Sequence, residues 1–177
     1  MPRTARFLTP VTLAALLLAG CTPSTPMPAP PPTPDATPVF ASDEEALAAA
    51  EEAYGKYLAT VDAIFADGGL NPERLLDVAS RAQYETELSG FKEMENGRLK
   101  GTGHATFELS LQSYRPTTGE VVVYSCDDIS GTDIITADGT SVVSPERPTR
   151  IPYEVRFVGD PLIVDSRNVW DGSGVCE

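Results

Sequence analysis

The sequence has a single histidine and only three cysteines among its 177 residues, and these do not follow the close pairwise spacing of zinc sites. Glycine-rich phosphate loops and dinucleotide-binding fingerprints are also absent. No uninterrupted apolar run approaches the roughly 20 residues that a membrane-spanning helix needs. We therefore predict no metal site, no cofactor and no transmembrane helix, and no motif identifies a catalytic residue.

Basic residues are scarce as well. The chain contains 13 Lys and Arg against 26 Asp and Glu, a formal net charge of −13. An acidic surface repels the phosphates of nucleic acids and the anionic headgroups of membranes. Nucleic acid is therefore excluded as a partner, and solubility alone is a sufficient reason for the charge.

The first twenty residues have the layout of a secretion signal. Arg3 and Arg6 precede an apolar run over residues 11–19, which is too short to span a bilayer. The run ends in Leu18-Ala19-Gly20-Cys21, which resembles the lipobox of bacterial lipoproteins. The resemblance implies diacylglycerol on Cys21 and cleavage before it. The alternative is an ordinary signal peptide followed by a chance cysteine.

A proline-rich segment follows the proposed lipid anchor. Eight of residues 22–38 are proline, a composition that favours extended polyproline II and cannot form a core. We predict a signal peptide over 1–20, a lipidated Cys21 with a stalk over 21–39, and a folded domain over 40–177. Two acyl chains suffice to hold the protein on the extracytoplasmic face of the cell membrane. A docking motif for a partner is the alternative role of the stalk.

The other two cysteines, Cys126 and Cys176, belong to the folded domain. In an oxidising compartment, two remaining cysteines predict one disulfide. A reactive or metal-bound thiol pair is the rival interpretation.

The domain begins with helical patterns. Ser42 and Glu45 form a capping box, and Asp67-Gly68-Gly69 ends the helix that follows. Asn71-Pro72 predicts the start of a short helix to about Ala79, and Ser80 starts a third helix to Asn96-Gly97. The apolar stripe of the first helix consists of Leu47, Ala50, Tyr54, Leu58, Val61 and Phe65.

After Gly101 the period becomes alternating, which predicts strands. These cover residues 105–112 and 120–126, a possible continuation over 129–136 with a short Val142-Val143, and a hairpin of 151–158 with 162–170. Helices followed by antiparallel strands define an α+β class. The predicted architecture is three N-terminal helices, the first one long, packed on a strongly curved antiparallel sheet of about four strands with one disulfide.

This element order over residues 42–170 resembles the nuclear-transport-factor-2-like superfamily, whose cone-shaped fold wraps a sheet around helices. A cystatin-like domain or a β-sandwich is the alternative fold. The whole chain also resembles a group of small actinobacterial lipoproteins of unknown role. The elements that carry this second resemblance are Val123-Tyr124-Ser125-Cys126 and Trp170-Asp171-Gly172 through Cys176.

The superfamily resemblance implies a cavity that holds a small molecule, where relatives use a carboxylate or a histidine. The candidate pocket residues are Tyr54, Tyr57, His104 and Tyr124. Each also has a structural interpretation, because the tyrosines suit a core or rim and a histidine at a strand end suits solvent. The helical phase of Asp62 predicts that it faces solvent.

Two weaker patterns complete the search. Ser89 and Lys92 match a Ser-x-x-Lys pair, but the other motifs of penicillin-interacting enzymes are missing. Asp127, Asp128, Asp133 and Asp138 could supply calcium ligands, but an acidic hairpin rim is the simpler interpretation. The leading hypothesis is a noncatalytic envelope lipoprotein that binds a protein partner or a small ligand. The alternatives are an isomerase-like or hydratase-like enzyme of the cone-shaped superfamily, and a structural role in envelope assembly.

Overall fold

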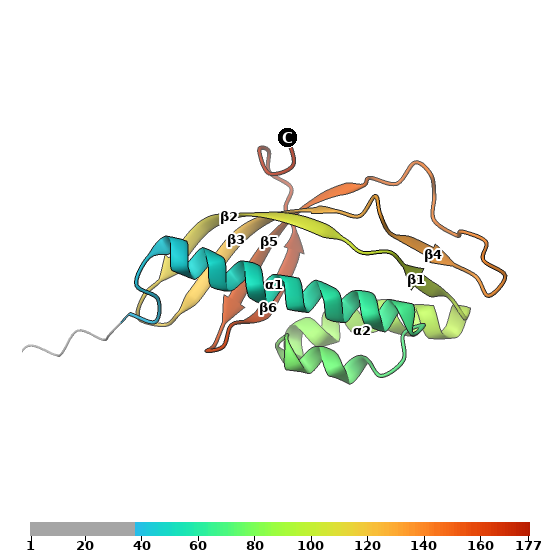
Figure 1. The fold of residues 1–177 in the computed structure, drawn as a ribbon, viewed down its shortest axis with the longest axis horizontal. Helices are drawn as coiled ribbons and strands as arrows, with labels where there is room; N and C mark the ends of the chain where they lie inside the picture. The colour runs from blue at the N-terminus through green and yellow to red at the C-terminus, as the bar shows by residue number, and fades with distance from the viewer. Residues whose placement is uncertain (1–37) are drawn as a thin grey trace, which may run out of the picture. The chain divides into compact units, whose positions relative to one another are not determined.

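The computed structural model describes residues 38–177, which form an α+β domain (Figure 1). The predicted signal peptide, Cys21 and nearly all of the proline-rich segment lie outside the described residues. The elements, in chain order, are α1 (Asp43–Ala66), the 3-10 helix η1 (Pro72–Asp77), α2 (Arg81–Gly97), β1 (Lys100–Thr102), β2 (Thr106–Arg115), β3 (Glu120–Asp128), β4 (Asp133–Ile135), β5 (Arg150–Val158) and β6 (Ile163–Val169).

The ends of α1 follow from local sequence. The Ser42 hydroxyl accepts a hydrogen bond from the Glu45 amide at 3.3 Å, and the Glu45 carboxylate accepts one from the Ala41 amide at 2.7 Å. At the other end the Gly69 amide donates to the Ile64 carbonyl at 2.8 Å. Gly69 has a φ of 85°, and a Cβ there would lie 2.0 Å from the Phe91 carbonyl oxygen of α2. Only glycine allows this close approach of the two helices.

The segment after α1 differs from its predicted form. Pro72–Asp77 is a 3-10 helix, and Asn71 adopts a left-handed conformation in which its side chain makes no capping hydrogen bond. The Ser80 side chain does cap α2, because it accepts a hydrogen bond from the Gln83 amide. A 3-10 turn suffices here because the connection between the two α-helices is short.

Four strands form an antiparallel sheet in the order β2-β3-β5-β6. Register shifts interrupt the pairing between Leu111 and Ser113 and between Arg156 and Phe157. Both α-helices lie on the same side of this sheet (Figure 1). The sheet therefore has a helix-covered inner face and an outer face.

The sequence suggested that residues 129–136 continue the preceding strand, but in the structure they do not. Residues 133–135 form β4, which pairs with β1 in a separate two-stranded ribbon. Sequence patterning missed β1 because only three residues pair, and they follow the end of α2 directly. The ribbon packs against the C-terminal part of α1 rather than extending the main sheet.

The core lies between α1 and the inner face of the sheet. Its largest fully buried side chains include Tyr54, Tyr57, Phe91 and Phe157. Tyr54 packs edge-on against Phe107 and Phe157, with ring centroids 5.0 and 6.2 Å apart. Burial of aromatic and branched side chains from both layers supplies the main stabilising term.

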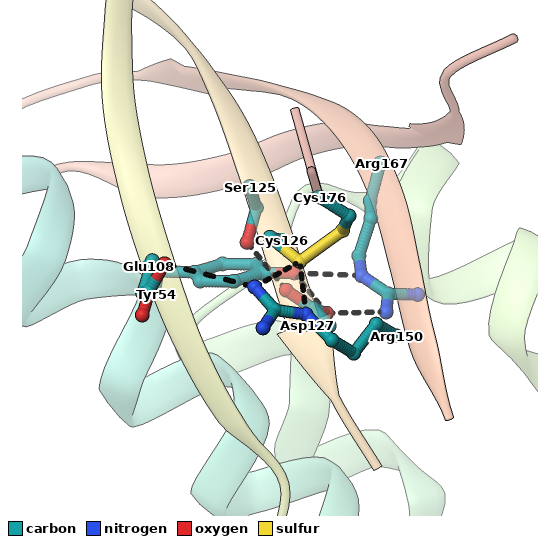
Figure 2. Close-up of a disulfide and its surroundings, with 8 residues drawn as sticks. All are labelled: Tyr54, Glu108, Ser125, Cys126, Asp127, Arg150, Arg167 and Cys176. Atoms are coloured by element: carbon teal, nitrogen blue, oxygen red, sulfur yellow. Dashed lines mark hydrogen bonds and ion pairs between the residues drawn. A yellow bond between two sulfur atoms is a disulfide. The ribbon is translucent and has the colours of Figure 1, made fainter. Parts of the chain in front are cut away.

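The C-terminal tail is fixed to the outer face of the sheet. Cys126 and Cys176 form the predicted disulfide, and Arg150 covers Cys126, with its Nη2 3.3 Å from Sγ (Figure 2). The Trp170 ring packs on Tyr124 at 4.8 Å between centroids. A Cβ on Gly172 would lie 2.5 Å from the indole, so glycine lets the tail turn tightly against Trp170.

Candidate functional site

A cavity of about 310 Å³ lies between the C-terminal half of α1, the β1–β4 ribbon and the inner face of β3, β5 and β6. Small-ligand sites occupy roughly 300–1,000 Å³. Most of its walls are apolar, including Leu58, Phe65, Ile129 and Ile151. A few charged side chains reach the same space, which is the composition of a small-molecule site.

The deepest of these charges belongs to Asp127, which is fully buried. Successive residues of a strand point to opposite faces, so Cys126 faces outward and Asp127 faces the core. Asp127 Oδ2 accepts hydrogen bonds from Tyr54 Oη and Arg167 Nη2, both at 2.7 Å, and Oδ1 accepts one from the Ser125 hydroxyl. Figure 2 shows this convergence next to the disulfide.

Arg167 balances the charge of Asp127. Its Nε donates to Tyr54 Oη at 2.8 Å, and its guanidinium carbon lies 3.4 Å from the centre of the Tyr153 ring. Burial alone would lower the pKa of Arg167, but the neighbouring oxygens of Tyr54 and Asp127 outweigh it and raise that pKa above its ordinary value. The guanidinium therefore stays charged, and the pair is held as a neutral unit in the core.

A second set of hydrogen bonds joins this pair to α2. The Gln83 side chain accepts from the Arg167 backbone amide at 3.0 Å and donates to Tyr57 Oη and Glu87 Oε1, at 3.0 and 2.8 Å. Tyr57 Oη donates to the same Glu87 oxygen at 2.7 Å. The network therefore runs from β3 through β6 to α2, and it fixes both helices to the sheet.

Burial raises the pKa of Tyr54 and of Tyr57 well above the ordinary value of a tyrosine. For Tyr57 the negative charge of Glu87 adds to this effect. Both phenols consequently remain protonated donors across the physiological range. They hold the carboxylates in place and do not serve as bases.

A histidine–carboxylate pair lies at the rim of the cavity. His104 Nδ1 is 3.2 Å from Asp62 Oδ2. The prediction that Asp62 faces solvent is wrong: its side chain is only 18% exposed, and it lines the cavity. Asp62 lies one step off the apolar stripe of α1, and the β1–β4 ribbon covers that flank of the helix. The His104 side chain, in contrast, is 85% exposed.

The four candidate pocket residues are placed differently. Tyr57 lines the cavity, and Tyr54 lies fully buried beside Asp127 and Arg167, which line it. His104 lies outside the lining, between the lining residues Gly103 and Ala105. Tyr124 packs on Trp170 on the outer face of the sheet. Tyr54 and Tyr57 therefore belong to the cavity and its immediate support, whereas Tyr124 does not.

The acidic residues proposed as a hairpin rim do not act together. Asp127 is a core residue, which corrects its placement on a solvated rim. Asp128 accepts a hydrogen bond from the Ser130 amide, whereas Asp133 and Asp138 bond within the following loop. Within residues 38–177 no group of three or more His, Cys, Asp or Glu side chains is placed to hold a metal ion. Ser89 and Lys92 are both exposed on α2.

Sequence reasoning missed Gln83, Glu87 and Arg167 as part of the site. A usable signal existed for Asp127, because Val121, Val123 and Ser125 share its strand phase and face the core. Arg167 carried no such signal, because the irregularity between β5 and β6 alters the strand phase.

Comparison of the chain with protein-family models, with curated proteins and with solved structures finds no match. No helix among the described residues is long and apolar enough to cross a membrane.

Proposed function

We propose that this protein is an extracytoplasmic lipoprotein, anchored to the cell membrane through lipid on Cys21, whose domain binds a small ligand without transforming it. We also propose that the domain is related to the nuclear-transport-factor-2-like superfamily. The element order supports that relation, with helical segments followed by a four-stranded antiparallel sheet. The cavity between helix and sheet lies where that relation expects one.

The state of Asp127 carries the proposal. This carboxylate lies deepest in the cavity wall, yet both of its oxygens already accept hydrogen bonds and its charge is matched by Arg167. A general base needs a lone pair within reach of the substrate proton. A carboxylate that is fully engaged within the protein instead supports a rigid, preformed binding wall.

The test is a ligand screen by saturation-transfer NMR on residues 21–177 with Cys21→Ser, which removes the lipid and the need for detergent. All described contacts lie within residues 38–177, so this chain retains them. Ala105 lines the cavity, and Ala105→Leu would fill part of it. Ala59→Leu makes the same chemical change on the exposed side of α1 and is the matched control.

We expect the screen to find ligands whose binding is lost in Ala105→Leu and retained in Ala59→Leu. Ligands that bind both variants equally would place binding outside the cavity and contradict the proposal. A screen without cavity ligands would also contradict it, and would turn attention to an envelope protein as the partner.

The His104–Asp62 pair favours one alternative, an enzyme of isomerase or hydratase type. A carboxylate that orients an imidazole at a cavity rim is an arrangement used for proton transfer. The measurement is turnover of each ligand that the screen finds. Conversion of a ligand that is abolished in His104→Gln or Asp62→Asn would replace the binding proposal with the enzyme.

A further inference from the structure

The cavity contains more negative than positive charge. Its charged lining residues are Asp62, Glu87, Asp127, Asp133, Arg147 and Arg167. Asp127 and Arg167 neutralise one another at 2.7 Å. The remaining side chains are three carboxylates and one guanidinium.

The one remaining guanidinium is engaged by backbone carbonyls and a hydroxyl group. Arg147 Nη2 donates to the backbone carbonyls of Ile129 and Thr132 and to the Thr132 hydroxyl. Among residues 38–177 no ion pair joins Arg147 to a carboxylate. Arg147 therefore holds the loop after β3 and leaves the helical wall of the cavity uncompensated.

Asp133, on β4, accepts hydrogen bonds from the Ile134 amide and the Ser141 hydroxyl. The other two uncompensated carboxylates lie on the helical wall. Glu87, on α2, accepts hydrogen bonds at Oε1 from the neutral groups of Tyr57 and Gln83, and no Lys or Arg of the described domain forms an ion pair with it. Among residues 38–177, the exposed imidazole of His104 is the one polar partner of the Asp62 side chain, on α1. Both acids are partly shielded from water. A charge interacts more strongly with a partner in such an environment than in bulk water.

Apart from the Asp127–Arg167 pair, Asp133 and Arg147, the strand side of the cavity is apolar and aromatic. Ile129, Ile134 and Ile151 line it together with the ring of Tyr153. A suitable occupant therefore combines an apolar body with a cationic head. The head would face Asp62 and Glu87, and the body would remove the isoleucine side chains from water.

We infer that the cavity binds small organic ammonium ions with an apolar or aromatic body. The inference rests on the proposed binding function and names its ligand class. The net charge of −13 acts in the same direction, because the field of an acidic protein concentrates cations near its surface.

The experiment compares three probes that share one apolar body: phenylbutylamine, phenylbutanol and phenylbutyrate. Their affinities are measured by isothermal titration calorimetry on residues 21–177 with Cys21→Ser. We expect the amine to bind about tenfold more tightly than the alcohol, and the carboxylate more weakly than either. Raising the salt concentration should weaken only the amine advantage.

Two variants locate the cationic head. Glu87→Gln retains an oxygen acceptor for Tyr57 and removes the charge, and Asp62→Asn does the same at the rim. Each should weaken amine binding by about three- to tenfold and leave the alcohol unchanged. Glu85→Gln, an exposed position on α2, is the matched control and should change neither. Thermal unfolding of all three variants checks that they fold.

Equal binding of the three probes, or a preference for the carboxylate, would overturn the ammonium inference while the proposed function stands. An amine preference that survives both charge-removing variants would also overturn it, because the charge would then lie elsewhere. Binding of none of the probes overturns the inference, and the screen with Ala105→Leu separately decides whether the proposed function fails as well.

Discussion

The carboxylate of Asp127 and the guanidinium of Arg167 meet at 2.7 Å inside the core, where Asp127 is fully buried and the Arg167 side chain is 17% exposed. The two residues lie on β3 and β6, strands separated by β5. Their contact spans the sheet beneath α1, and Tyr54 Oη closes it into a ring of three groups. The ring connects the core to the cavity wall.

Breaking this pair should strongly destabilise the domain. Asp127→Ala leaves the Arg167 charge without its partner, and loss of one partner of a buried pair costs about 3–5 kcal/mol. Urea unfolding followed by circular dichroism measures the change. Asp171→Ala, at an exposed position in the tail, is the control and should change stability by less than about 0.5 kcal/mol. A loss below about 1 kcal/mol for Asp127→Ala would mean that the pair does not form.

Alkaline pH should unfold the protein through Tyr54 and Tyr57. Each raised pKa means that the folded state holds its phenolic proton more tightly than the unfolded chain does. The contribution of the two phenols to the free energy of unfolding is complete below the ordinary tyrosine pKa of about 10 and is lost as pH rises above it. The free energy of unfolding should then fall by up to about 2.7 kcal/mol per pH unit for the two groups together.

The rise in absorbance near 295 nm measures this in the folded protein, since ionisation of a tyrosine adds absorbance there and the contribution of Trp170 stays constant. Two of the six tyrosines should not ionise until the circular dichroism signal is lost. In the double variant Tyr54→Phe/Tyr57→Phe, the absorbance increase that accompanies unfolding of the wild type should be absent. Ionisation of all six tyrosines near pH 10 in a still-folded wild-type chain would be incompatible with the buried phenols.

Reduction of the disulfide should lower the melting temperature. Cys126 and Cys176 are separated by 50 positions, and closing a loop of that size contributes about 4 kcal/mol in the chain-entropy model. We expect a decrease of roughly 10–15 °C in differential scanning calorimetry. The variant Cys126→Ser/Cys176→Ser should melt at the lower temperature with or without reductant. An unchanged wild-type melting temperature under reduction would show that the bond does not stabilise the domain.

Replacement of Cys21 tests the anchor. With Cys21→Ser no lipid can be attached, and the net charge of −13 disfavours binding to anionic lipids. Immunoblots of membrane and soluble fractions should show the variant leaving the membrane fraction, whereas Ser24→Ala, in the same segment, should remain bound. Retention of Cys21→Ser on the membrane would contradict lipid anchoring.

Local signals predicted the elements whose causes are local. The Ser42 and Ser80 caps, the glycines that end α1 and the alternation of β2 all act within a few residues, and each prediction is confirmed. The predicted disulfide is also confirmed, and Cys126 and Cys176 are the two cysteines that the predicted lipobox leaves for it. The β1–β4 pairing joins segments far apart in the chain, and no local pattern specified it.

The sequence by itself determined the α+β class, the capped helices, the main antiparallel strands and the disulfide, because caps, turn residues and side-chain periodicity are written in neighbouring positions. The tertiary structure alone decided that Asp127 is buried against Arg167, that Asp62 and Glu87 face one cavity, and that Tyr124 supports the tail. Those outcomes depend on which strands pair, in what register, and on which face each helix packs. These are contacts between residues far apart in the chain, and their free energy has no signature in local spacing.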